Sequence, residues 1–259
     1  MLKLYLDDTG THEDSPIVGV GGFIGTEAQW AEFDGRWRAV LESPLPGKPT
    51  LSQWHSYDCR WGLKEFSGYS EPERDRVTCI FRDVITQSGL VSLTNFVDVS
   101  AWNEVLAELG PDKLATGETT ALYRLLMRAV PFAAIQKDGP DIAVFYDLGR
   151  LADPEVGRFS SLLNDPTTAP PHILSLTFLR VADATPLQGA DMIATETFWF
   201  VKEFQRHGGK AVPRPHFASY LRDNEKNGNG EFLDREAIIK HKMTKISGSS
   251  AWQWNVRLS

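Results

Sequence analysis

The sequence has few cysteines, no long apolar run and no excess of basic residues. Cys59 and Cys79 are its only cysteines. They are too few for a disulfide framework or a zinc pattern, so buried free thiols are expected. No apolar run approaches the roughly 20 residues of a membrane-spanning helix. The chain also begins directly with a predicted strand, without a signal peptide. The sequence therefore predicts a cytoplasmic protein with no membrane partner.

The charge is acidic overall and unevenly distributed. The formal net charge is −7, which argues mildly against a nucleic-acid binder. Residues 202–246 carry ten Lys/Arg and six Asp/Glu, whereas residues 1–201 carry 16 and 28. This distribution is compatible with a metal site beside a phosphate-contacting surface. It is equally compatible with ordinary solvated faces, which charge alone favours.

Length and composition indicate one globular domain. The chain has 259 residues, of which 42% are apolar and 24% charged, and it shows no repeat or low-complexity tract. We expect a single domain over residues 1–259, with an insertion at about 27–88 and a C-terminal extension at about 208–259.

The apolar patterns predict an α/β fold. Strands are expected at residues 2–8, 15–26, 89–99, 141–149, 172–183 and 250–258. Helices are expected at 27–43, 71–88, 117–137, 154–165, 185–209 and 232–243. This order indicates a mixed sheet that opens with an antiparallel hairpin and continues with parallel strands, with helices on its faces.

Three aspartates lie where strands or a helix could present them together. Asp7 stands at the end of the first strand, Asp147 near the end of a strand buried on both faces, and Asp191 among apolar residues of a helix. Each has an ordinary explanation, such as a turn for Asp7 or a salt bridge for Asp191. Glu118 begins a long helix, where an acid complements the helix dipole.

Convergence of these acids would require a cation. Carboxylates held together repel one another, and their hard oxygen atoms suit Mg²⁺ or Mn²⁺. Such ions can activate a water for phosphodiester cleavage. His55, in the segment "QWHSYD", could serve as a general acid or base or contact a phosphate, although a lone histidine is more often structural.

Four segments resemble a known family. "LYLDDTG" (4–10) is similar to an opening strand motif and "LQGADMIA" (187–194) to a closing helix motif, while "FYDLG" and "WHSYD" match intermediate motifs more weakly. These motifs are those of the domain-of-unknown-function 3800 family (DUF3800), which is similar in fold to ribonuclease H-like proteins. Asp8 and Thr9 stand where the family usually has glutamate and serine.

The resemblance implies a ribonuclease H-like fold in which Asp7, Asp147 and Asp191 meet at a metal site. Glu118 joins them by the order of elements rather than by a motif. Asp8, the neighbour of Asp7, is expected to face the other side of the strand and to form a turn with Thr9 and Gly10.

The sequence supports two main hypotheses. The first is a metal-dependent nuclease in which Asp7, His55, Asp147 and Asp191 are catalytic and nucleic acid is the partner. The second is a non-catalytic ribonuclease H-like binding module of a defence or mobile-element system. A two-carboxylate glycosidase would suit the tryptophans but not acids on three separate elements. The choice of DNA or RNA, the cleavage mode, the oligomeric state and the pathway stay open.

Overall fold

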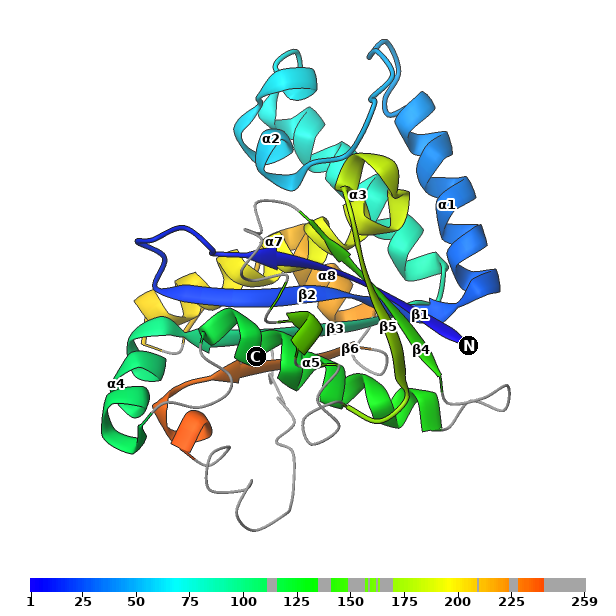
Figure 1. Ribbon diagram of the computed structural model, residues 1–259. Helices are drawn as coiled ribbons and strands as arrows, with labels where there is room; N and C mark the ends of the chain where they lie inside the picture. Colours follow the sequence, from blue (N-terminus) through cyan, green and yellow to red (C-terminus); the bar gives the residue numbers. More distant parts are fainter. Residues whose placement is uncertain are drawn as a thin grey trace.

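A mixed sheet of six strands forms the centre of the computed structural model (Figure 1). The structure describes residues 1–110, 116–134, 141–148, 157, 159–161, 163, 170–208, 210–223 and 228–239. The strands are β1 (Leu2–Thr9), β2 (Ile17–Thr26), β3 (Val91–Asp98), β4 (Ile142–Asp147), β5 (Ile173–Leu179) and β6 (Gly228–Leu233). The predicted strand at 250–258 lies outside the described residues, as do parts of the helices predicted at 154–165 and 232–243.

Helices cover the sheet and extend beyond it. They are α1 (Glu27–Glu42), α2 (Ser56–Trp61), α3 (Glu71–Gln87), α4 (Val99–Leu109), α5 (Gly117–Ala134), α7 (Thr185–Arg206) and α8 (Pro215–Asp223), with 3-10 turns η1 (Lys64–Phe66) and η2 (Val181–Asp183). In Figure 1, α1, α2 and α3 form a layer that rises above the sheet. None of the described helices is long and apolar enough to cross a membrane.

The sheet order is β5-β4-β1-β2-β3-β6. Antiparallel pairing joins β1 to β2 and β2 to β3, whereas β4 runs parallel to β1, β5 to β4 and β6 to β3. The predicted hairpin and parallel continuation are confirmed. The apolar strand β4 lies between β1 and β5, as its continuous pattern predicted. This order and these strand directions confirm the mixed sheet that the sequence predicted.

The two faces of the sheet pack against different helices. Leu4 and Leu6 of β1 and Val20 of β2 are buried in a core that includes the apolar side of α5. Tyr5 and Phe23 point the opposite way, into a core that includes α1, α3, α7 and α8. Alternation along each strand thus gives the sheet one face for α5 and one for α7, and the prediction of helices on both faces is confirmed.

Two local sequence features position α1 and α7. Thr26 caps α1 in a reciprocal pair of hydrogen bonds with Gln29, which sets the point at which the helix starts. Gly21 of β2 lets α7 approach closely, because a Cβ atom there would lie 2.9 Å from the Cα of Ala194. The close packing of α7 against β2 fixes the helix that carries Asp191.

The structure corrects several boundaries. Strand β1 runs through Asp8 to Thr9, so the expected turn starts later, at Gly10, whose φ is +74°. Helices α2, α4 and α8 were not predicted. The segment expected to begin a helix at Phe232 instead belongs to β6, which runs to Leu233 and pairs with β3. Pairing with a distant strand outweighs the local helical pattern there.

Candidate metal site

Asp7 and Asp147 lie side by side on adjacent parallel strands. The register pairs Leu6 with Tyr146, so Asp7 and Asp147 occupy the next position on each strand. Two residues earlier, Tyr5 and Phe145 stack with ring centroids 4.6 Å apart on the α7 face. Because strand side chains alternate with a period of two, both aspartates also face α7.

Asp191 approaches Asp7 from α7. Burial raises the pKa of Asp7 well above its ordinary value, and the negative charges of Asp191, Asp8 and Asp147 raise it further. The backbone N–H of Asp8 donates to Asp7 Oδ1 at 2.8 Å and offsets only part of this effect. The other two predicted aspartates therefore both act electrostatically on Asp7 in the fold.

The other two carboxylates also accept hydrogen bonds from the protein. Asp191 Oδ2 accepts from the backbone N–H of Ser56 at 2.7 Å, and its Oδ1 accepts from the Thr195 hydroxyl at 3.3 Å. Burial raises the pKa of Asp191, against the charge of His55 and the bonds from Ser56. Asp147 Oδ1 accepts from the backbone N–H of Val181 at 2.8 Å. These bonds fix the direction of each carboxylate.

His55 is held beside Asp191 by its two neighbours in the chain. The backbone N–H of Trp54 donates to Gln188 Oε1 at 2.8 Å, and that of Ser56 donates to Asp191. The Nδ1 atom of His55 lies 2.9 Å from Asp58 Oδ2, and the side chain of His55 is 38% exposed. A fixed imidazole with one side open to solvent is suited to proton transfer next to the carboxylates.

Glu118 lies on the other side of the sheet from α7. The Tyr146 hydroxyl donates to Glu118 Oε1 at 3.4 Å, and Tyr146 belongs to the core on the α5 face. The acids that raise the pKa of Asp7 are Asp191, Asp8 and Asp147. The structure thus places Glu118 near the end of β4 but against Tyr146, and its role as a ligand stays a prediction.

The donor chemistry fits a divalent cation. Carboxylate oxygens crowd a buried position, where they are unstable without positive charge. Among the described residues, no group of three or more His, Cys, Asp or Glu side chains is already spaced as ligands of one ion. Mg²⁺ commonly binds through one or two carboxylates and completes its shell with water and substrate phosphate. Asp7 with Asp147 or Asp191 would supply the one or two carboxylates that such an ion needs.

Sequence reasoning missed the side chains that position the site. Gln188 Oε1 accepts two hydrogen bonds, from Trp54 N and from Trp37 Nε1 at 2.9 Å, and Thr195 supports Asp191. Gln188, Asp191 and Thr195 lie on one face of α7, because Gln188 is three residues before Asp191 and Thr195 four residues after it. The quoted segment "LQGADMIA" contains Gln188, so helical spacing from Asp191 was the signal that could have identified it.

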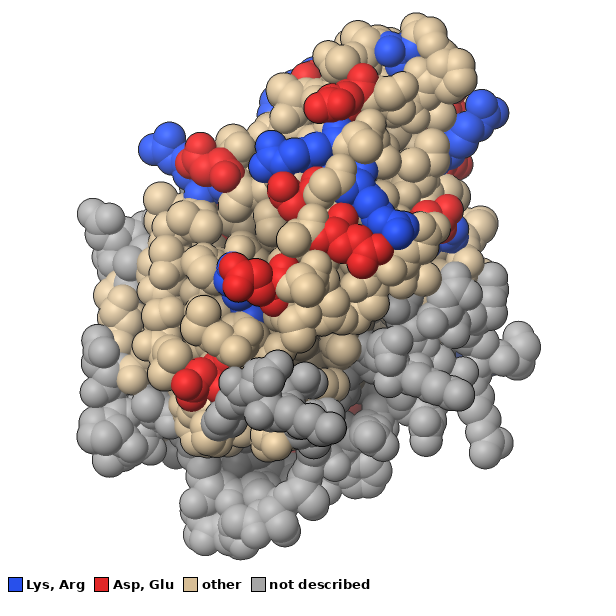
Figure 2. Space-filling model, turned by 90° about the vertical axis from the view of Figure 1, so that its right-hand side faces the viewer, with Lys and Arg blue, Asp and Glu red and all other residues tan. Residues whose placement is uncertain are grey.

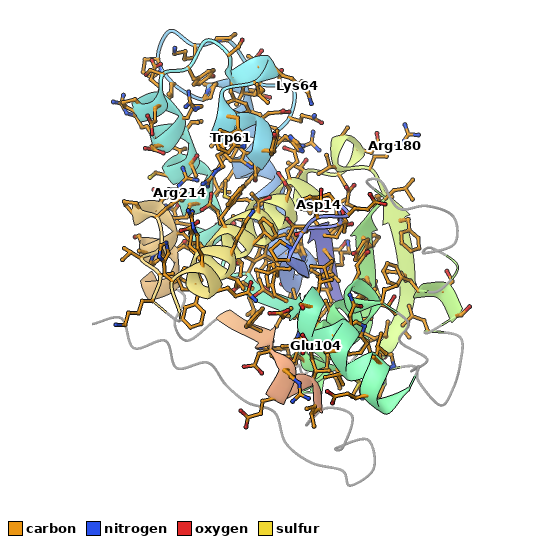
Figure 3. The ribbon with its side chains drawn as sticks, turned by 90° about the vertical axis from the view of Figure 1, so that its left-hand side faces the viewer. Asp14, Trp61, Lys64, Glu104, Arg180 and Arg214 are labelled. Carbon is orange, nitrogen blue, oxygen red and sulfur yellow. The ribbon has the colours of Figure 1, made fainter. Side chains whose placement is uncertain are left out.

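Figure 3 looks onto the end of the sheet at which β1 and β4 finish. Asp14, from the loop after β1, lies near the centre of the view. Lys64 and Trp61 lie on one side of it and Arg180 on the other. Lys64 Nζ pairs with Asp58 Oδ2 at 2.9 Å and keeps most of its surface exposed. Basic and aromatic groups therefore flank this end of the molecule.

Comparisons with known proteins give only a distant likeness. No family model matches the sequence, and no curated protein matches it. The crystal structure of Bst-RNase HIII in complex with Mn²⁺ is similar at 15% identity with a TM-score of 0.47, over 86% of this chain and 62% of that chain. The complex of PCNA with RNase HII from Archaeoglobus fulgidus is similar at 13% identity with a TM-score of 0.36, over 87% of this chain and 89% of that chain.

These two likenesses concern the path of the backbone. This chain spans 62% of the length of the RNase HIII chain. Identities this low transfer no residue roles, so the assignment of the carboxylates depends on their own geometry and charge.

Proposed function

We propose that this protein is a metal-dependent nuclease that hydrolyses phosphodiester bonds of nucleic acid. One observation carries the proposal: Asp7 is buried next to Asp191 and Asp147, which raise its pKa by their charge. Such a cluster destabilises the metal-free fold, so it needs a compensating role. Binding a divalent cation provides one.

The carboxylates and His55 would have different roles in the reaction. Asp7, Asp147 and Asp191 would hold Mg²⁺ or Mn²⁺, and Glu118 is a further proposed ligand. When bound, such an ion supplies positive charge and lowers the pKa of a coordinated water. His55, with Asp58 at its Nδ1, would keep Nε2 free to protonate the leaving oxygen or to contact the phosphate.

A non-catalytic binding module is the second candidate. It is favoured by the backbone hydrogen bonds to Asp147 and Asp191, because a structural carboxylate would make the same bonds. Membership of the DUF3800 family and a cytoplasmic location belong to the proposal as well. Metal-dependent cleavage of nucleic acid distinguishes the nuclease from the non-catalytic binding module.

The test is a cleavage assay on single-stranded, duplex and hybrid oligonucleotides, with Mg²⁺, with Mn²⁺ and with a chelator. We expect cleavage that needs the metal. Asp147→Asn keeps the shape of the side chain but removes a ligand charge, so it should abolish turnover. Asp83→Asn, on a half-exposed acid of α3 that pairs with Arg82, is the matched control and should leave activity unchanged.

His55→Ala should slow the reaction by roughly 10²-fold or more if His55 is a general acid. Activity that survives both chelation and Asp147→Asn would show that the mechanism is wrong. Absence of cleavage on every substrate would favour the binding module.

A further inference from the structure

A pocket of about 200 Å³ is lined in part by the segment that contacts Asp191. Its walls come from α2, α3, α7 and the segment before α8, and they include Ser56, Arg60 and Trp61. The backbone N–H of Ser56 donates to Asp191, so one short segment connects the pocket with the candidate metal site. A ligand that fills the pocket would thus contact the segment that holds Asp191.

Large aromatic rings are exposed at the rim of this pocket. Tyr57 is 54% and Trp61 is 53% exposed, and their ring centroids lie 6.4 Å apart. Trp61 also lies 6.5 Å from Trp199 of α7. The two exposed rings of α2, with the partly buried ring of Trp199 beside them, form an apolar platform of the kind that marks an interaction surface.

Cations are interleaved with these rings. The guanidinium of Arg60 lies 4.3 Å from the centroid of the Trp199 ring and 5.5 Å from that of Trp61. Lys202 Nζ lies 5.1 Å from the Trp199 centroid. Trp61 thus carries a cation beside its ring and keeps about half of its surface available.

Arg60 has hydrogen-bonding capacity left over. Its Nη1 is buried and has no hydrogen-bond partner among the described residues. The other arginines of the pocket are engaged: Arg74 donates to the Tyr69 carbonyl, and Arg214 pairs with Glu196 at 2.9 Å. Arg60 lines the pocket and is only partly buried as a residue, so its guanidinium favours an anionic ligand there.

The face of the molecule opposite the aromatic-cationic platform carries paired surface charges instead. On the face that carries α1, Figure 2 shows Lys and Arg side chains interspersed with Asp and Glu. Several of these residues form ordinary surface pairs, such as Arg38 with Asp34 at 2.9 Å. The aromatic-cationic platform therefore belongs to the end of the molecule that carries the carboxylates, where Figure 3 shows Trp61 between Lys64 and Arg214.

We propose that Trp61 and Arg60 form a subsite for single-stranded nucleic acid, in which an unpaired base stacks on Trp61 and the adjacent phosphate binds the guanidinium of Arg60. This inference rests on the proposed nuclease function and adds its substrate class. Proteins hold single strands by combining aromatic stacking with cationic contacts to the backbone. Bases inside a duplex are stacked on one another, so they cannot offer a free face to Trp61.

The experiment measures binding separately from cleavage. A fluorescein-labelled oligothymidylate and a blunt duplex of the same length are titrated with the Asp147→Asn protein in Mg²⁺, with fluorescence anisotropy as the readout. Trp61→Ala in that background should weaken single-strand binding roughly 5- to 100-fold. Trp61→Phe should restore most of the affinity, because phenylalanine keeps an aromatic face.

A salt series tests the phosphate contact. Arg60→Gln should lower the slope of log K against log salt by about 0.7, the value for one phosphate contact on a single strand. Arg38→Gln removes the same charge on exposed α1 and should not change that slope. A structural role for Arg60 alone would not alter the salt dependence.

Two results would overturn the subsite: single-strand binding unaffected by Trp61→Ala, or an equal loss on single strand and duplex. These outcomes are distinct from failure of the nuclease proposal. If Trp61-dependent binding occurs but wild-type protein cleaves nothing, the subsite stands and the nuclease proposal fails. If wild-type protein cleaves and Trp61→Ala cleaves and binds equally well, the subsite fails and the nuclease proposal stands.

Discussion

Replacing Gln188 by methionine should destabilise the protein strongly, although the residue is neither charged nor a proposed ligand. Its Oε1 accepts from Trp37 Nε1 at 2.9 Å and from Trp54 N at 2.8 Å, and the residue is only 3% exposed. Methionine has similar volume but no comparable acceptor, so both buried donors lose their partner. Each unpaired buried donor costs about 1–3 kcal/mol.

The expected loss in free energy of unfolding is about 2–5 kcal/mol, which corresponds to a fall in Tm of roughly 5–15 °C. Urea unfolding followed by circular dichroism and by tryptophan fluorescence measures it. Gln87→Met on α3 is the control, since Gln87 accepts from Arg36 at the exposed surface. A Gln188→Met protein within about 0.5 kcal/mol of this control would show that the two hydrogen bonds to Gln188 Oε1 do not stabilise the fold.

Two further changes test the buried acids. Asp7→Asn should raise the free energy of unfolding of the metal-free protein at neutral pH by about 1–2 kcal/mol, because it removes a buried charge that Asp191 repels. Mn²⁺ should raise the Tm of wild type but not that of the variant. A variant that is less stable than wild type in the absence of metal would contradict this prediction. Burial alone would raise the pKa of Glu196, but the hydrogen bond and charge of His216 and the charge of Arg214 hold it below its ordinary value. Glu196 therefore contributes stability that is present above the ordinary pKa of 4.5 and is lost as the pH falls through the lowered value. Chemical unfolding from pH 6 to about pH 3 should show a smaller loss of stability in Glu196→Gln than in wild type or in the exposed control Glu203→Gln, and equal losses in all three would exclude this role.

The sequence predicted the sheet because its strands carry strong local patterns. Alternation in β1 and the continuous apolar run of β4 were sufficient to identify a hairpin and a central strand. Strand β6 (Gly228–Leu233) contains glycine and asparagine and is defined by pairing with β3, more than 100 residues away in the chain. Helix α2 has six residues, too few for a helical period to be visible in an aromatic segment.

The candidate site was predictable in its acids but not in its supports. Asp7, Asp147 and Asp191 stand out because carboxylates among apolar residues need an explanation. Gln188 had only its helical spacing from Asp191 as a signal, since its partners Trp54 and Trp37 lie 134 and 151 positions away. The face occupied by Glu118 likewise depends on how α5 packs against the sheet, which element order alone does not determine.

Anomalous diffraction from a crystal of the protein soaked in Mn²⁺ would show whether Asp7, Asp147 and Asp191 bind a divalent cation. Manganese scatters anomalously, so its position can be located without reference to the protein density. We expect an anomalous peak at the ends of β1 and β4, within coordination distance of Asp7 and of Asp147 or Asp191. A map with no peak at these carboxylates, at Mn²⁺ concentrations that label other sites, would contradict this expectation.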